Sequence, residues 1–414
     1  MKRVVITGLG VLSPIGNDLE TFWGNLKLGR HGFTLEDWFP GQSEEHKLVS
    51  ARVKSFEPLE YFEKKELRRT DKLTQYAVYA TMKAIEDAGG IECFKGLDPY
   101  RCGVIIGSGI GGIETAEEQI MAYHNKGYKR VSVFTIPMMI GNMAAGVAAI
   151  KTGFKGTNYC PVSACSSSAH ALGEAFRAIK HGYLDMAVAG GVEACTIGFA
   201  YAGFNNMTAV TTSRDVDRAS IPFDKDRNGF VLGEGAGVLV LEEYEQAVAR
   251  GAQIYAELGG YGSTCDAFHE TLPNPEGSGG AKAMELAVSE AGLNPADIGY
   301  INAHGTSTPP NDRTETAAIK TTFGEHAYKL AINSTKSMTG HLLGAAGSVE
   351  AIATVLQMKH NFLHPTIGYK TPDPDCDLDY IVSGGREAAI NAAVSNSLGF
   401  GGHNVSICLK SMQK

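Results

Sequence analysis

The sequence lacks a long hydrophobic run, a paired cysteine motif and any excess of positive charge. No apolar stretch among its 414 residues approaches the roughly 20 residues of a membrane-spanning helix, so we expect no membrane insertion. The formal net charge of −8 gives the whole molecule no general attraction to nucleic acid, and we expect no such partner. The eight cysteines form no CxxC pair, which is typical of reduced thiols in the cytoplasm.

The first residues, MKRVVITGLGVLSPIG, resemble a signal peptide because basic residues precede an apolar run. The glycines, Pro14 and the lack of a small-x-small cleavage pattern favour a buried first strand and a turn instead. We therefore expect a cytoplasmic protein.

Glycine is abundant, with 50 residues grouped in motifs such as GSGIGG, GEGAG and GFGG, which predict tight turns. Short apolar runs predict buried strands over 4–11, 102–109, 186–191, 237–244, 298–305 and 392–400. Helical spacing of apolar residues, ended by glycine, predicts helices over 72–89, 168–182 and 278–292. The alternation of strands and helices indicates an α/β protein with largely parallel sheets.

Two segments indicate an internal duplication. Residues 158–176 and residues 330–352 both run from a strand through a polar turn into a helix of small residues. No repeat is visible at the level of single residues. We infer two similar halves and place their boundary after a helix-like stretch, giving residues 1–254 and 255–414.

A glycine motif follows the predicted strand at 102–109. Gly107, Gly109 and Gly112 fit GxGxxG, the dinucleotide fingerprint. That fingerprint needs an acidic residue about 20 positions further on, and the sequence has none there. We favour a tight turn that lines a pocket.

Cys165 is the leading candidate for a nucleophile. In VSACSSSAHALGEAF (162–176) a buried strand delivers the cysteine to a turn, and a helix follows. The helix N-terminus predicts a depressed thiol pKa, because backbone N–H groups and the helix dipole stabilise a thiolate. Taken alone, a cysteine in an apolar strand is more often part of the core.

The second half strengthens the case for a polar pocket. His304, Lys336 and His341 stand at predicted strand ends, and each is flanked by Gly, Ser or Thr. Such a set indicates a shared site more than three separate structural side chains. The glycines of SNSLGFGGHN (395–404) would let backbone N–H groups approach a ligand closely.

Five motifs together carry a specific resemblance over essentially the whole chain: SACSSS (163–168), PFDKDRNGFVLGEGAG (222–237), NAHGTSTP (302–309), STKSMTGHLLGAAG (334–347) and NSLGFGGHN (396–404). The chain resembles the elongating β-ketoacyl-[acyl-carrier-protein] synthases, closest to synthase II, within the thiolase-like superfamily. The resemblance implies a thiolase-like fold of two similar halves that form a layered α-β-α-β-α core.

The Cys-His-His set separates this chain from other branches of the superfamily. Initiating synthases carry asparagine where His341 stands, thiolases use a second cysteine near the chain end, and chain-length-factor relatives lack the nucleophilic cysteine. The resemblance therefore implies an active elongating enzyme. It would perform a decarboxylative Claisen condensation of malonyl-acyl carrier protein with an acyl chain held on Cys165, in fatty acid elongation.

The resemblance also implies individual roles. The N–H groups of Cys165 and Phe400 would form an oxyanion hole, and His304 and His341 would stabilise the charge that develops on decarboxylation. Lys336 would orient the site with Glu350 as its partner, and the competing reading is a purely structural ion pair. Phe400, set between glycines, would gate the tunnel.

The remaining expectations concern binding surfaces. Thr306 and Thr308 would hold the pantetheine arm, and the acyl tunnel would be lined by Ile110, Thr135, Ile136 and Phe204, some of them supplied across a homodimer. Acyl carrier protein would dock on a basic surface made of Lys64, Lys65, Arg68, Arg69, Lys129 and Arg130. Thr208 departs from the docking arginine of some relatives.

No cofactor is required by this chemistry. Relatives often carry a structural Na⁺ or K⁺, and here its ligands would be Asn302, Ala303, Glu350, Ser395 and Asn396. Two alternatives stay open from sequence. One is a polyketide-type ketosynthase that uses the same malonyl unit, and the other is a non-catalytic partner subunit that determines chain length.

Overall fold

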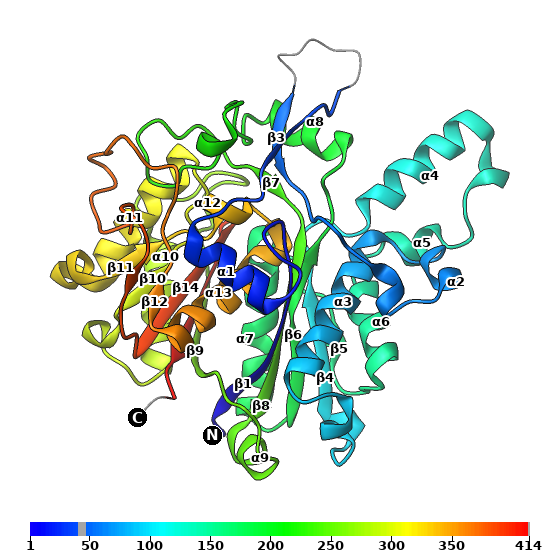
Figure 1. Ribbon diagram of the computed structural model, residues 1–414, viewed down its shortest axis with the longest axis horizontal. Coiled ribbons are helices and arrows are strands. Elements are labelled where there is room, and N and C mark those ends of the chain that lie inside the picture. Colours follow the sequence, from blue (N-terminus) through cyan, green and yellow to red (C-terminus); the bar gives the residue numbers. More distant parts are fainter. Residues whose placement is uncertain (40–46, 413–414) are drawn as a thin grey trace.

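The computed structural model describes residues 1–39 and 47–412, and a ten-stranded mixed sheet lies at its centre (Figure 1). The strand order is β11-β10-β14-β15-β9-β1-β8-β6-β4-β5. In the first half the strands are β1 (Val4–Leu12), β4 (Cys102–Gly107), β5 (Asn158–Tyr159), β6 (Met186–Glu193) and β8 (Gly235–Glu243). In the second they are β9 (Ala256–Cys265), β10 (Tyr300–Asn302), β11 (Ala331–Asn333), β14 (Ala392–Gly399) and β15 (His403–Lys410).

The strand order repeats in the two halves. From either edge inward, the five strands of a half follow as its third, second, fourth, fifth and first strand in chain order. The pairings also repeat, since β4 and β10 are each parallel to both neighbours, whereas β8 and β15 are antiparallel to theirs. The expectation of two similar halves is confirmed. The boundary between 254 and 255 stays a prediction.

The expectation of largely parallel sheets is wrong. Part of the difference is a hairpin: β14 turns directly into β15, and so short a link makes the two strands antiparallel. At the centre of the sheet β1 lies between β8 and β9, which are joined through α9 (Tyr244–Ala249), and it is antiparallel to both.

Helices cover the strands in layers. α7 (Ser167–Lys180) and α13 (Ala346–His360) share the central hydrophobic core, and every residue from Ala346 to Met358 is buried. Helices α3 (Lys72–Asp87) and α6 (Met143–Thr152) form one outer layer, and α10 (Ser278–Glu290) and α11 (Pro309–Phe323) form the other (Figure 1). The α-β-α-β-α core is thereby confirmed.

The remaining helices and short strands lie around this core. The helices are α1 (Leu19–Leu28), α2 (Lys64–Leu67), α4 (Ile113–Lys126), α5 (Thr135–Met139), α8 (Gly198–Asn206) and α12 (Lys336–Thr339). The short strands are β2 (Thr34–Glu36), β3 (Leu48–Ala51), β7 (Leu232–Gly233), β12 (Phe362–Leu363) and β13 (Arg386–Glu387). The N-terminal apolar run is the fully buried strand β1, as predicted. Within the described residues, no helix is both long and apolar enough to cross a membrane.

Candidate active site

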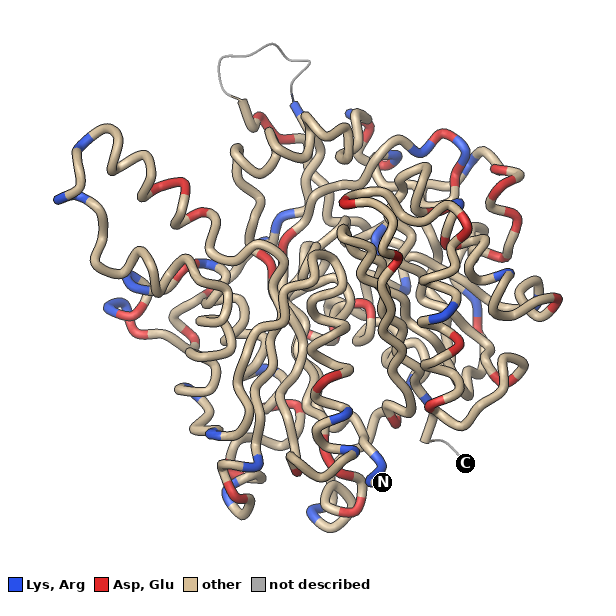
Figure 2. The backbone as a smooth tube through the Cα atoms, turned by 180° about the vertical axis from the view of Figure 1, so that it is seen from behind, with Lys and Arg blue, Asp and Glu red and all other residues tan. Residues whose placement is uncertain are grey.

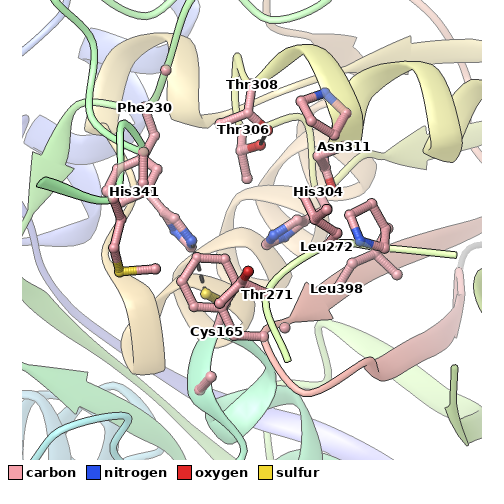
Figure 3. A pocket seen from close by; sticks show the side chains of 18 of the residues that line it. Cys165, Phe230, Thr271, Leu272, His304, Thr306, Thr308, Asn311, His341 and Leu398 are labelled. Carbon is pink, nitrogen blue, oxygen red and sulfur yellow. Dashed lines mark hydrogen bonds between the residues drawn. The ribbon is translucent and has the colours of Figure 1, made fainter. Parts of the chain in front are cut away.

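A cavity of about 440 Å³ lies between the two halves and is lined by side chains from both. Cys165 comes from the first half, and His304, His341 and Phe400 come from the second. Figure 3 shows the two imidazoles pointing toward the sulfur, with Thr306 on the opposite side of the rings. The sequence-predicted polar pocket therefore exists.

Cys165 lies on a strained turn. It is the middle residue of the 3-10 turn η6 (Ala164–Ser166), and α7 begins at the next residue. Ala164 has a φ of 51°, a left-handed conformation that costs a non-glycine residue on the order of 1–2 kcal/mol. Ser167 Oγ donates to the Ala164 carbonyl at 2.7 Å and accepts from the Ser163 N–H at 2.9 Å, which fixes the turn.

The expected depression of the thiol pKa is wrong. Cys165 is only 6% exposed, and burial raises the pKa of its thiol to about 12. The charge of Lys336 and the N–H groups of Phe400 and Cys165 oppose that rise without overcoming it. The resting sulfur is a thiol, so a nearby acceptor must take its proton before or during attack.

Two neutral histidines face the thiol. His341 Nε2 lies 3.0 Å from Cys165 Sγ, and the rings of His304 and His341 are 5.3 Å apart. Burial lowers the pKa of both imidazoles well below the usual value, and the positive charge of Lys336 lowers it further. Ligand atoms of Cys165, His304 and His341 all lie within 4.8 Å of one another. One small group can therefore contact all three.

Lys336 fixes the orientation of His304. Its ammonium donates to His304 Nδ1 at 3.2 Å, to the His304 carbonyl at 2.7 Å and to Glu350 Oε1 at 2.5 Å. Because Nδ1 accepts, the neutral ring carries its proton on Nε2 and can donate it into the cavity. Burial raises the pKa of Glu350 to about 7, and Lys336 opposes the rise.

The loop that follows β14 closes over the sulfur. A Cβ on Gly399 would lie 2.8 Å from the Ser163 carbonyl and 3.3 Å from the Cys165 nitrogen, so only glycine fits this approach. Gly401 and Gly402 have φ of 82° and 73°, which favour glycine as well. The N–H of Phe400 is thereby brought to Cys165. The glycines thus allow the close backbone approach that the sequence predicts, and the oxyanion hole itself stays a prediction.

Family models match most of this chain. Residues 1–247 match the beta-ketoacyl synthase N-terminal domain, and residues 255–370 match the C-terminal domain. The chain belongs to the beta-ketoacyl synthase family. The 3-oxoacyl-[acyl-carrier-protein] synthase 2 of Synechocystis sp. is 48% identical over 413 residues, covering 100% of this chain and 99% of that protein. The Staphylococcus aureus (strain COL) protein of the same name is also 48% identical, with 100% and 99% coverage.

Solved structures agree with this family assignment. A beta-ketoacyl synthase from Burkholderia phymatum matches with a TM-score of 0.91 and 36% identity, covering 100% of both chains. A type II polyketide ketosynthase, solved with its acyl-carrier protein and bound to the hexaketide, gives a TM-score of 0.91 and 34% identity, again covering 100% of both chains.

The other predicted binding residues of this beta-ketoacyl synthase divide into two groups. Thr306, Thr308, Ile110 and Phe204 line the cavity, and the two threonine hydroxyls lie 2.8 Å apart. Thr135 and Ile136 do not line it: they lie on α5, where Ile136 is 60% exposed. Within the described residues of a single chain, the structure therefore brings only part of the predicted tunnel together.

The predicted docking residues form two exposed clusters. One lies on and just after α2, and the other lies at the turn after α4 (Figure 2). The residues of the two clusters are Lys64, Lys65, Arg68, Arg69, Lys129 and Arg130. Lys65 forms a surface ion pair with Glu63. In Figure 2 the regions of α2 and of the turn after α4 lie on one side of the molecule, opposite the C-terminus, and both carry basic residues.

The predicted cation ligands are buried and only partly satisfied. Asn302 Oδ1 and Glu350 Oε2 have no hydrogen-bond partner among the described residues. Asn302, Ala303, Glu350, Ser395 and Asn396 are each at most 3% exposed. Two buried oxygens without donors fit a small cation, because oxygen is the preferred ligand of hard cations.

Two buried carboxylates were missed by sequence reasoning. Glu315, on α11, accepts the N–H groups of His304 and Gly305, each at 2.8 Å. Glu193, at the end of β6, accepts from the N–H of Gly344 in the other half at 3.0 Å. Glu315 lies 11 residues after His304 and could have been found as a returning helix residue. No sequence signal connects Glu193 with Gly344.

Proposed function

We propose that this chain is an elongating β-ketoacyl-[acyl-carrier-protein] synthase of fatty acid synthesis. It would join malonyl-acyl carrier protein to an acyl chain held on Cys165, giving 3-oxoacyl-acyl carrier protein and CO₂. The observation that carries the proposal is the convergence of Cys165, His304 and His341 within 4.8 Å. The relatives named 3-oxoacyl-[acyl-carrier-protein] synthase 2 support the same reaction.

In the first half-reaction the acyl group moves to the protein. Cys165 Sγ attacks the thioester of the acyl carrier, and its proton has an exchange partner in His341 Nε2, 3.0 Å away. The N–H groups of Cys165 and Phe400 stabilise the tetrahedral oxyanion. The carrier leaves as a thiol with the proton that Cys165 gave up, so charge and protons balance.

In the second half-reaction malonyl-acyl carrier protein enters the space that the first carrier has left, while the acyl chain stays on Cys165. Loss of CO₂ from the malonyl group leaves an enolate, and the Nε2–H of His304 donates to its oxygen. Once Cys165 is acylated, His341 Nε2 no longer faces a thiol proton; in the tautomer with its proton on Nε2, this ring donates from the other side of the same space, and each such donor contributes on the order of 3 kcal/mol. The enolate carbon then attacks the Cys165 thioester, the carbon–sulfur bond breaks to release the 3-oxoacyl product, and the sulfur takes up one proton from solvent to return to the resting thiol. Lys336 acts through His304 and touches no substrate.

A monovalent cation belongs to this proposal as a structural element. Asn302 Oδ1 and Glu350 Oε2 would hold Na⁺ or K⁺, together with the Ala303 carbonyl and the oxygens of Ser395 and Asn396. The ion would neutralise the Glu350 oxygen that Lys336 leaves unpaired. The ion would supply charge balance and would take part in no chemical step.

Acyl carrier protein is the proposed partner. The clusters on α2 and after α4 present exposed basic side chains that would attract an acidic carrier despite the net charge of −8. Thr306 and Thr308 lie at the cavity wall, where the amides of a pantetheine arm would pass. Phe400 would swing to admit the chain.

A homodimer is proposed from an apolar surface. Ile150, on the helix α6 that packs beside the edge strand β5, is 77% exposed, and Val162, just after β5, is 68% exposed. Such a patch together with an open sheet edge marks an interface. A second copy would bring Thr135 and Ile136 to the partner's tunnel. The eight free thiols agree with a cytoplasmic location, which completes the proposal.

A polyketide-type ketosynthase is the second candidate, favoured by the 34% identity to a structure that holds a hexaketide. The 48% identity to 3-oxoacyl-[acyl-carrier-protein] synthase 2 of Synechocystis sp. favours the first. A recombinant assay with saturated and polyketide acyl carriers separates them, since failure to condense saturated chains would reject the proposal. Acyl-chain competition kinetics would then give the preferred length.

The decisive experiment is mass spectrometry after incubation with acyl carrier protein. We expect one acyl adduct on Cys165, none in the Cys165→Gln variant and an unchanged adduct in the Cys195→Ala variant. Cys195 is a matched control, because it is a buried cysteine of the same core cluster that does not line the cavity. The Cys165→Gln variant should keep malonyl decarboxylation. A wild-type protein without an adduct would favour the non-catalytic subunit.

A further inference from the structure

Glu193, the last residue of β6, is a fully buried carboxylate for which the proposed mechanism has no use. Its two oxygens accept four hydrogen bonds and donate none. Oε2 accepts the N–H groups of Gly109 (2.8 Å) and Gly344 (3.0 Å). Oε1 accepts the Ser108 hydroxyl (3.0 Å) and the N–H of Ile110 (3.3 Å). The carboxylate thus joins the loop after β4 to the 3-10 turn η10 (Leu343–Ala345) of the second half.

This contact explains the middle glycine, Gly109, of the motif that resembles a dinucleotide fingerprint. Backbone N–H groups gather after β4 as they would around a phosphate, but the anion is the protein's own Glu193. A Cβ on Gly109 would lie 2.7 Å from Oε2, and a Cβ on Gly344 would lie 2.8 Å from it. Ser108 Oγ accepts the Gly111 N–H at 3.0 Å, so its own proton is free to point to Glu193.

The segments that Glu193 holds surround the nucleophile. Gly109 and Ile110 line the cavity beside Cys165. A Cβ on Gly109 would lie only 3.4 Å from the Ala164 carbonyl, so this loop packs against the turn that carries the sulfur. On the other side, Leu343 of η10 also lines the cavity. One buried anion therefore fixes the relative position of both walls and of the nucleophile turn.

We propose that Glu193 is a positioning residue for acyl transfer, an internal anion that holds the cavity-lining loop after β4 and the turn η10 in register with Cys165. It touches neither the sulfur nor either catalytic imidazole. Loss of its carboxylate should therefore slow the arrival of the acyl chain on Cys165 more than it slows malonyl decarboxylation.

The charge of Glu193 has a second effect at the sulfur. Its negative charge raises the pKa of Cys165, beyond the rise that burial causes. Glutamine at this position would remove the charge, and its amide N–H₂ would face donors. Removal of the charge should increase the thiolate fraction of Cys165 even while acyl transfer becomes slower. A residue that only stabilised the fold would not separate these two quantities.

The test compares Glu193→Gln with Glu242→Gln. Glu242 is equally buried and accepts from Arg250 and Thr7, but it pairs with Met186 at the opposite end of β6. We expect Glu193→Gln to raise the rate of Cys165 alkylation by iodoacetamide at pH 8 about threefold, because the thiolate is the reactive form. It should lower acyl transfer from acyl carrier protein about tenfold, while malonyl decarboxylation changes less than about threefold.

The control variant should change neither alkylation nor the ratio of the two half-reactions. Equal effects in both variants, or an unchanged alkylation rate in Glu193→Gln, would overturn the proposal. If Glu193→Gln does not fold, Ser108→Ala removes one of the four bonds and keeps the charge. It should slow acyl transfer about threefold, and no slowing would overturn the proposal. The acyl-transfer readout rests on the proposed function, whereas alkylation needs no substrate. A wild-type protein that alkylates normally but takes no acyl group would reject the function alone.

Discussion

The two strand–turn–helix units on either side of the cavity share a backbone plan and differ in chemistry. In the first half η6 leads into α7, and in the second half η10 leads into α13. Each turn begins with a left-handed residue that is not glycine, Ala164 with a φ of 51° and Leu343 with a φ of 45°. The residue that follows is Cys165 in one turn and Gly344 in the other.

This difference teaches that backbone strain here belongs to the fold. A strained residue is often read as a sign of function, yet the second turn keeps the strain without a reactive side chain. Its N–H is used instead to hold the carboxylate of Glu193. The second half contributes its chemistry elsewhere, through His304 after β10 and through Lys336 and His341 around α12. One half supplies the sulfur, and the other supplies charge and proton handling.

The largest effect is expected from a substitution that makes the two turns alike. Cys165→Gly gives the first turn the residue that the second turn has at this position. Condensation should fall by more than about 10³-fold, because no nucleophile remains to hold the acyl chain. The thermal midpoint should change little, since the second turn shows that the backbone accepts glycine. Product formation by liquid chromatography and a melting curve are the two measurements. More than 1% residual condensation would contradict the role of Cys165.

Removing the chemistry of the second half gives the next largest effect. His304→Ala and His341→Ala should each lower malonyl decarboxylation by about 10²–10³-fold, because each removes a donor to the developing enolate. Release of labelled CO₂ from malonyl-acyl carrier protein measures this rate. His326→Ala is the control, since His326 bonds the Ile298 carbonyl and does not line the cavity. An unchanged rate in either active-site variant would refute its role.

Lys336→Met tests whether Lys336 serves the chemistry or only the fold. The change leaves the buried Glu350 without its cation and should cost about 3 kcal/mol in the free energy of unfolding. It should also raise the pKa of His304, because the charge of Lys336 lowers that pKa. Denaturant melts and the pH profile of decarboxylation measure the two effects.

The double variant Lys336→Met/Glu350→Gln separates the two readings. Removing both charges should restore most of the stability, because no unpaired ion remains buried. Decarboxylation should stay low, since His304 still lacks the donor that sets its tautomer. Recovery of both the stability and the decarboxylation rate would show that Lys336 and Glu350 form only a structural ion pair.

The sequence predicted the reactive side chains well and their electrostatics badly. Cys165, His304 and His341 stand beside glycines and hydroxyl residues at strand ends. This pattern is local in the chain and is therefore visible in the sequence itself. The thiol pKa was wrong because it depends on burial, which brings together segments far apart in the chain. Glu193 was missed for the same reason: its partner Gly344 lies 151 residues away, and only the sheet topology makes them neighbours.

The fold divides in the same way. Apolar runs and helical spacing predicted β1, β4, β6, β8, α3, α7 and α10 at nearly their observed positions. They could not predict strand direction. Alternation of strands and helices is typical of parallel sheets, but the first and last strands of each half, β1 with β8 and β9 with β15, pair antiparallel although most of that half separates them in the chain.

The ends of β6 and β14 give the smallest expected difference. The first ends in the buried carboxylate of Glu193, and the second ends in Gly399, next to Phe400. Burial raises the pKa of Glu193 to about 7 from an ordinary value of 4.5. A raised carboxyl pKa means that the folded state holds the proton more tightly than the unfolded state. The stabilisation is therefore complete below about pH 4.5 and is lost as the pH rises through about 7.

Comparison of the wild type with Glu193→Gln isolates this effect, because Glu350 titrates in both proteins. Between pH 5 and pH 8 the wild type should lose about 2.5 kcal/mol of unfolding free energy relative to the variant. Urea melts at several pH values measure it. If the unfolding free energies of the two proteins changed in parallel with pH, the four donors would hold the pKa of Glu193 near its ordinary value. The carboxylate would then be a permanent anion at neutral pH, and the end of β6 would keep a full negative charge where the end of β14 has none.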